Sequence, residues 1–387
     1  TLTIQSGGTL KSKANNSPKF LNLSLSSNLT IDTGGAINLN ALGFLGGVTD
    51  TNGSGSGAST GTDNPCAQKG GPGASYGGSG AAGSYRTVGV TYGSLTAPTD
   101  LGSGGTGGDG SCGSGGTGGA GGGAIKLSVT GTLTVNGTLS ANGAAGTGGT
   151  YGGGGGGSGG SLNLTTGTWA GAGTISATGG AGEINTYDDG GGGGGGRIAI
   201  AYTTKTYTGS TTAYGGSGLQ AGGAGTVWTK AAAATNGDLL LDNNSLAGTT
   251  TQVAAATWTV NDLTLKNATT LVIPSGATVN VAGTLANFTA GVTLTNNGTL
   301  SVTGAVPAFP AGVFTFTNNG SLSLAATTSL TNVTFTQNGT LTTLANLTLG
   351  SGTSMEVQNT DATTVLSLTT LTIQSGGTLK SKANNSP

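Results

Sequence analysis

Residues 292–302 read VTLTNNGTLSV, and this stretch sets the pattern that decides the fold. Val292 and Leu294 are two positions apart, so on a strand their side chains share one face. The Asn-Gly pair at 297–298 supplies the positive φ that a tight corner needs, and the apolar residues after it start a second strand. The stretch therefore predicts a strand, a corner and another strand.

The same corner recurs along the chain at a regular spacing. Its variants are NNGSL ending at Leu322, QNGTL ending at Leu341, and SGGTL ending at Leu10 and at Leu379. The corner glycines at 276, 298, 320 and 339 are 22, 22 and 19 residues apart. Hairpins give a turn signal about every 8–12 residues, whereas a spacing of roughly 20 is typical of stacked parallel β-helix coils. We therefore predict an all-β chain with a β-solenoid (parallel β-helix-like) module; antiparallel β-sandwich modules are the alternative.

A duplicated segment indicates that the strand-and-corner pattern continues in further repeats. TLTIQSGGTLKSKANNSP, residues 1–18, recurs unchanged as residues 370–387, at an offset of 369. A solenoid constrains only core and turn positions, so identity at every position indicates a genetic repeat. We expect the chain to be one period of a longer tandem array that runs on past Pro387. An artificial overlap with no array behind it is the alternative.

Glycine divides the chain into two kinds of module. Of the 82 glycines, 64 lie between residues 43 and 228, so this range is predicted to be a Gly-rich β module. Residues 1–42 are expected to continue a β-solenoid from the preceding repeat. Residues 229–387 are expected to form the next β-solenoid module.

The Gly-rich module has an internal repeat of its own. TGTLTVNGTLSANGAAG from Thr130 aligns with TGTWAGAGTISATGGAG from Thr166, a period of 36 residues. Glycine tracts such as 152–157 and 190–196 precede its strands. Because glycine lacks a Cβ, such tracts can stack closely as extended or polyproline-II-like strands. Surface linkers are the alternative reading.

Composition limits the function. Charged residues make up 6% of the chain, the net charge is −1 and histidine is absent, so a nucleic-acid or membrane-binding basic surface is not expected. Leu, Ile and Val recur at alternate positions, which argues against disorder. The polar residues are mainly Thr, Ser and Asn, as in many secreted β-proteins, so we expect an extracellular or cell-surface location. Cys66 and Cys112 are expected to form a disulfide there; two unpaired buried thiols are the alternative.

Few residues offer chemistry. Asp188 and Asp189 lie near Glu183 and Arg197, but adjacent strand residues point to opposite faces, so a solvated turn or a Ca²⁺ ligand is a better interpretation than a catalytic pair. Without histidine no nucleophile has a base partner. We therefore predict no enzyme, no catalytic residue, no cofactor and no metal site.

Two surfaces suggest other functions. Thr-x-Thr runs such as 293–295 and 315–317 could form hydroxyl ladders of the kind that bind ice, although any strand with polar outward positions produces them. Trp169, Trp228 and Trp258 could bind glycans if exposed on one face, but packing in the core is the simpler expectation.

Three runs resemble a known class of protein. They are YGSLTAPTDLGSGG from Tyr92, GGGAIKLSVTGTLTVNGTLSANG from Gly121 and GGGGGGGRIAI from Gly190, and they are similar to Gly-rich modules of very large secreted bacterial surface proteins. The strand-and-corner module resembles the β-helical stalks of filamentous-haemagglutinin-type and autotransporter adhesins. The resemblance implies a surface location and brings no catalytic residue.

The sequence thus predicts a structural repeat unit of an extracellular fibre or cell-surface stalk that elongates by stacking tandem β modules. Its expected partners are further copies of the repeat in the same polypeptide and neighbouring fibre chains. The alternative is an adhesin or glycan-binding surface protein with a glycan or cell-surface ligand. An ice-binding or polysaccharide-degrading β-helix ranks below both.

Overall fold

The computed structural model describes residues 1–12, 20–60, 70–83, 87–110, 114–184, 188–254, 256–286, 288–289, 291–310, 314–357 and 366–381. Over these ranges the regular elements are β-strands and no helix occurs, so none is long and apolar enough to span a membrane. Cys66 and Cys112 of the expected disulfide lie outside the described residues, as do 13–18 and 382–387 of the duplicated segment.

Two compact units make up the chain. One comprises Thr1–Ala234 and Leu241–Thr251, and the other comprises Thr235–Leu240 and Gln252–Pro387. The expected segments 1–42 and 43–228 therefore lie in the same unit. The connecting stretch, in which residues of the two units alternate, contains β13 (Asp238–Asp242) and β14 (Thr250–Gln252).

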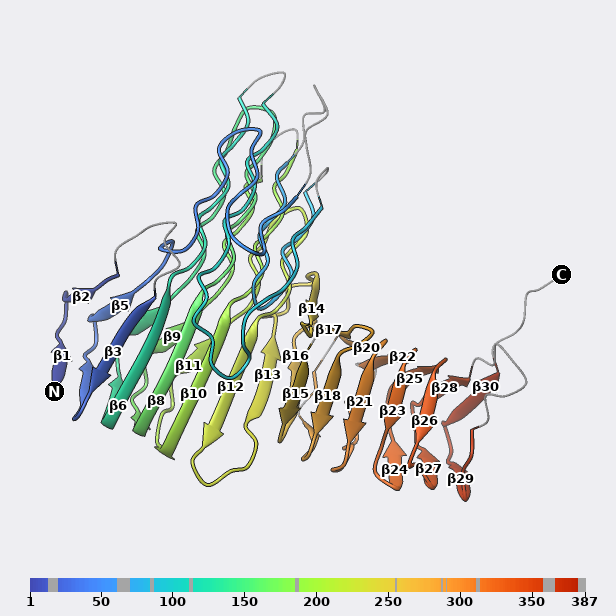
Figure 1. Cartoon of the computed structure of the whole chain (residues 1–387). Helices are drawn as coiled ribbons and strands as arrows, with labels where there is room; N and C mark the ends of the chain where they lie inside the picture. The colour runs from blue at the N-terminus through green and yellow to red at the C-terminus, as the bar shows by residue number, and fades with distance from the viewer. Residues whose placement is uncertain are drawn as a thin grey trace. The chain divides into compact units, whose positions relative to one another are not determined.

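The first unit is a parallel β-solenoid. Its longer sheet runs in the order β1 (Leu2–Ile4), β4 (Leu29–Ile31), β6 (Ala124–Val135), β8 (Ser161–Ala170), β10 (Arg197–Lys205) and β12 (Thr226–Ala231), with β3 (Leu21–Leu25) also paired to β6 (Figure 1). A second sheet runs β2 (Thr9–Leu10), β5 (Ala36–Asn38), β7 (Thr138–Ser140), β9 (Thr174–Ser176) and β11 (Ser210–Thr212). These pairings are parallel, as the β-solenoid prediction requires and the antiparallel sandwich does not.

The 36-residue repeat is one coil of this solenoid. Leu139 of β7 pairs with Ile175 of β9, and both are fully buried. At the following corner the amide side chain of Asn142 accepts a 2.8 Å hydrogen bond from the N–H of Thr178, 36 residues later. From β7 to β11 the strands pair at separations of 36 residues, so the sequence period coincides with the spacing of these coils.

Between their strands these coils leave the sheets as glycine-rich segments that run out and back side by side (Figure 1). The segments at 152–160 and 190–196 are buried throughout and form no strand. Their N–H groups instead donate to three neighbouring segments in turn. Along 190–196 the pairs are Gly191 to Gly71, Gly192 to Gln220, Gly193 to Gly180, Gly194 to Ala74, Gly195 to Gly223 and Gly196 to Ala177. Residues three apart face the same neighbour, which is the period of a polyproline-II helix.

Close approach explains why this bundle needs glycine. A Cβ at Gly193 would overlap the carbonyl oxygen of Gly157 and lie 2.9 Å from that of Gly156. The φ of Gly193 is outside the left-handed region, so conformational freedom is not the reason for glycine there. The expectation that the tracts pack rather than link is therefore confirmed for these segments.

The second unit is also a parallel solenoid, and its complete coils have three strands. One sheet contains, in order, β17 (Thr270–Ile273), β20 (Val292–Asn296), β22 (Phe314–Asn318), β25 (Val333–Gln337), β28 (Ser354–Val357) and β30 (Thr378–Ser381), and a second contains β15 (Thr257–Val260), β18 (Thr278–Val281), β21 (Thr299–Val302), β23 (Ser321–Ser323) and β26 (Thr340–Thr342). A third contains β24 (Thr327–Leu330), β27 (Asn346–Leu349) and β29 (Thr370–Ile373). In addition, β16 (Leu263–Lys266) pairs with β19 (Leu285–Ala286). Alternate residues point inward and form columns. Phe316 and Phe335 lie in one such column, with stacked rings 4.8 Å apart.

Amide ladders hold the corners of the second unit. The buried side chain of Asn296 donates to Asn318 at 2.7 Å, and Asn318 donates to Gln337 at 3.1 Å, at sequence separations of 22 and 19. The corner glycines are also 22 and 19 residues apart, so the amide ladder and the corners have the same spacing. Each buried amide satisfies the next, which removes most of the cost of burying them.

The expectation of positive φ is wrong for the Asn-Gly corners and correct for the Gly-Gly corners. The φ of Gly298, Gly320 and Gly339 is not positive, nor is that of the asparagines before them. Their requirement for glycine is instead contact between coils, since a Cβ at Gly320 would overlap the carbonyl oxygen of Gly298. Positive φ does occur at the first glycine of SGG corners, at Gly7 (79°) and Gly376 (81°).

Candidate functional site

The acidic residues singled out from the sequence lie beside the glycine bundle. Their main-chain atoms serve the glycine bundle: Gly153 N–H donates to Asp188 O at 2.8 Å, and Gly190 N–H donates to Glu183 O at 2.7 Å. Among the described residues no group of three His, Cys, Asp or Glu side chains could hold a metal. Arg197 is fully buried in the first unit.

Arg197 instead centres a polar cluster that the sequence did not reveal. Its Nε donates to Tyr92 O at 2.8 Å and its Nη1 to Thr226 Oγ1 at 3.3 Å. The guanidinium carbon lies 5.6 Å from the ring centroid of Tyr76, and Tyr76 Oη shares a 2.6 Å hydrogen bond with Ser161 Oγ. A lone tyrosine within a glycine tract, as at position 76, was the available signal.

Burial dominates the electrostatics of this cluster. It lowers the pKa of Arg197 and raises the pKa of Tyr76 and of Tyr92. The tyrosines therefore stay neutral hydrogen-bonding groups at any ordinary pH. Since the tyrosines belong to the Gly-rich segments while Arg197 begins β10, the arrangement fastens those segments to the solenoid strands.

The three tryptophans do not form an exposed sugar platform. Trp169, Trp228 and Trp258 are 2%, 8% and 5% exposed. Trp169 stacks on Tyr207 with ring centroids 4.7 Å apart, and the ammonium of Lys205 lies 4.8 Å from its centroid. The expectation that they pack in the core is confirmed.

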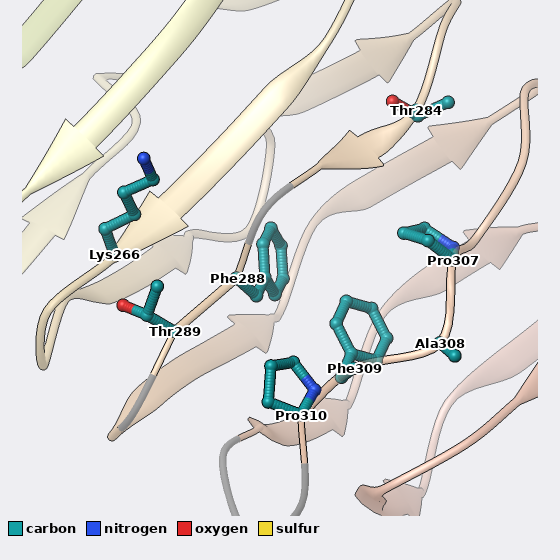
Figure 2. Close-up of a pocket in the computed structure, with 8 residues that line it drawn as sticks. All are labelled: Lys266, Thr284, Phe288, Thr289, Pro307, Ala308, Phe309 and Pro310. Carbon is teal, nitrogen blue, oxygen red and sulfur yellow. The ribbon is translucent and has the colours of Figure 1, made fainter.

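The second unit contains a pocket of about 530 Å³. Figure 2 shows the rings of Phe288 and Phe309 at its centre, with Lys266 at one side. The two rings are 5.1 Å apart and almost fully buried. The rest of the lining is Thr284, Thr289, Pro307, Ala308 and Pro310. It is a mainly apolar pocket with one cation, and its sequence signal was the proline-containing insertion VPAFP before β22.

Threonine ladders are present but short. One column on the outward side of the sheet consists of Thr270, Thr293, Thr315 and Thr334, and Thr295, Thr317 and Thr336 form a second column beside it. The double ladder spans three coils and then meets Ser354 and Glu356. A surface that binds a regular lattice needs a longer flat array, so this face gives ice binding little support.

The coils at the two ends of the described chain have open edges. In their sheets β1 and β2 pair only with β4 and β5, and β29 and β30 pair only with β27 and β28. An open parallel edge presents unpaired N–H and C=O groups to another strand. These edges are the candidate functional surfaces.

Comparison with known proteins identifies no relative: no family model, curated protein or solved structure matches the chain.

Proposed function

We propose that this chain is the structural repeat unit of an extracellular fibre or cell-surface stalk that lengthens by stacking tandem β modules. The observation that carries the proposal is the parallel, in-register stacking of coils in each unit, ending in open edge strands. A parallel coil stack can be extended by one more coil without disturbing those already present. The outward Thr, Ser and Asn side chains and the low charge suit a secreted protein.

Polypeptides of one, two and three repeats test this proposal. We expect the maximum dimension from small-angle scattering to rise linearly with repeat number, because stacked modules form a stiff rod. Repeats joined flexibly would lengthen roughly as the square root of their number, and that result would contradict the proposal. Antibodies to the chain should label filaments on intact producing cells.

A glycan-binding adhesin is the second candidate, and the pocket around Phe288 and Phe309 is the observation that favours it. Aromatic rings and one ammonium suit a sugar carrying a negative charge. A glycan array with the full chain would test it, with Lys266→Ala as the variant that should lose binding. Absence of any bound glycan would remove this candidate.

A further inference from the structure

Two copies of one twelve-residue sequence are described, at Thr1–Ser12 and at Thr370–Ser381. Both form a strand, an SGG corner and a second strand. At the corner Gly8 N–H donates to Gln5 O at 2.8 Å, and the equivalent bond in the second copy is 2.9 Å. The two copies therefore have the same local shape.

Their neighbours lie on opposite sides. The first copy pairs with strands that follow it: Leu2 with Leu29, Ile4 with Ile31 and Leu10 with Ile37. The second copy pairs with strands that precede it: Leu371 with Leu347, Ile373 with Leu349 and Leu379 with Met355. The first copy therefore shows how this coil contacts the coil after it, and the second copy shows how it contacts the coil before it.

The hydrogen bonds to these two neighbours use different backbone groups. In the first copy the N–H groups of Leu2 and Gly7 donate to the following coil at 2.9 Å, and the carbonyls of Ile4 and Gly8 accept from it. In the second copy the N–H groups of Thr370, Gln374 and Thr378 donate to the preceding coil at 2.9–3.2 Å. These three correspond to positions 1, 5 and 9 of the first copy. None of these groups is used in both copies, so one coil can make both sets of bonds together.

Side chains of the first copy are more buried than those of the second, as expected if a coil must lie on the open edge of the second copy. Ile4 is 7% exposed, whereas Ile373, at the same position of the repeat, is 48% exposed. The first copy is covered by Leu29 and Ile31, both fully buried. Since the sequences are identical, the neighbouring coil alone accounts for the difference, and it identifies what fits on the open edge of β29 and β30.

We infer that the coil Thr370–Ser381 is shared by successive repeats: on its open edge it binds β4 and β5 of a second copy of this chain. The register is that of the first copy, with Leu371 against Leu29, Ile373 against Ile31 and Leu379 against Ile37 of the next repeat. The inference rests on the proposed function and specifies its junction: the coil has β27 and β28 on one side and the next β4 and β5 on the other.

A two-repeat polypeptide, residues 1–369 followed by 1–387, tests the shared coil. Residues 1–12 of the second repeat form its junction coil and are numbered 370–381 by their place in this polypeptide. The first Lys380 therefore lies at the junction and the last at an open edge, and the masses of singly cut fragments distinguish the two cuts. We expect the junction cut to be at least about tenfold slower, because strand pairing on both sides suppresses local opening. Equal rates of cutting at the two positions would overturn the inference.

Substitutions supply the matched comparison. Ile373→Asp should abolish protection when placed at the junction and change the cutting rate by less than about twofold at the open edge. Thr372→Asp, on the exposed side of the same strand, should have no effect at either position. Protection that survives Ile373→Asp at the junction would also overturn the shared coil.

Scattering from the same polypeptide separates this inference from the fibre proposal. Equal cutting rates together with a doubled length would reject the shared coil and retain the fibre. A protected junction in a protein that forms no filament on its producing cells would retain the shared coil and reject the fibre.

Discussion

Replacing one glycine at the centre of the polyproline-II bundle should destabilise the first unit strongly. In Gly193→Ala the new methyl would overlap the carbonyl oxygen of Gly157. Relief requires one segment to move, yet Gly157 N–H is bonded to Ala144 O at 2.9 Å and Gly193 N–H to Gly180 O at 2.9 Å. Overpacking costs about 1–3 kcal/mol, and two lost backbone hydrogen bonds add about 1 kcal/mol each, so we expect a loss of about 3–5 kcal/mol.

Urea unfolding measures this loss. In a Trp258→Phe background, the fluorescence of Trp169 and Trp228 reports on the first unit. With a slope of about 2 kcal/mol per molar urea, the midpoint should fall by roughly 1.5–2.5 M. Hydrogen exchange in peptides covering 152–160 should rise in parallel, because that segment loses its neighbour.

Gly148→Ala is the matched control. Position 148 is exposed, and a Cβ there would meet only the end of the Glu183 side chain, at 3.0 Å. It should leave the unfolding free energy unchanged or raise it by about 0.4–1 kcal/mol, because alanine restricts the unfolded chain. If Gly193→Ala proved no more harmful than Gly148→Ala, the segments could not be in the close contact described.

Three further outcomes are expected. Asn318→Ala should cost the second unit about 2–3 kcal/mol of unfolding free energy, because the buried amides of Asn296 and Gln337 each lose a hydrogen bond to Asn318. Urea unfolding followed by Trp258 fluorescence measures this loss. Asn319→Ala, in the exposed ladder, is the control and should cost less than about 1 kcal/mol. Arg197→Lys should lower the stability of the first unit by about 2–4 kcal/mol, because one ammonium cannot replace both guanidinium bonds, and unchanged thermal unfolding would contradict this. Burial raises the pKa of Tyr207 to about 12 from 10.0, so the neutral phenol is favoured in the folded state. Its contribution to stability is complete below pH 10 and is lost between pH 10 and about pH 12. In alkaline unfolding curves, Tyr207→Phe should therefore reduce the fall of the unfolding free energy with pH over this range.

The solenoid could be predicted from the sequence because its information is local and periodic. Corners such as NNGTL fix where a coil turns, and the apolar residues two apart fix which face is buried. The role of the glycines in the Asn-Gly corners is not predictable in this way because the constraint is not local: Gly320 is required by the carbonyl of Gly298 on the preceding coil. A single sequence window contains no record of that contact.

The bundle is less evident in the sequence because its period is three rather than two. In residues 114–122, SGGTGGAGG, the side chains at Ser114, Thr117 and Ala120 recur at every third position. Ser114 and Thr117 are exposed and Ala120 is half-buried, while Gly116, two residues after Ser114, is buried. A G-G-x period is therefore a usable signal for a polyproline-II helix with one face toward solvent. The Arg197 cluster has no periodic signal, because its members come from segments far apart in the sequence; the lone tyrosine at position 76 is its one local sign.

A glycine homopolymer has no register of its own, since sliding one tract by three residues restores the same contacts. In this protein the strands supply the register. Each buried tract runs directly into a strand, at Gly160–Ser161 and at Gly196–Arg197, and Ser161 pairs with Arg197 across β8 and β10. The side-chain columns of those strands permit only one alignment, so the tracts enter the bundle level with one another. The coils from β7 to β11 keep a separation of 36, whereas coils in the second unit vary between 19 and 24. An excursion can shorten while its strands keep their register: Arg197 pairs with Thr226 at a separation of 29, and the tract before Thr226 still joins the bundle, where Gly195 N–H donates to Gly223 O.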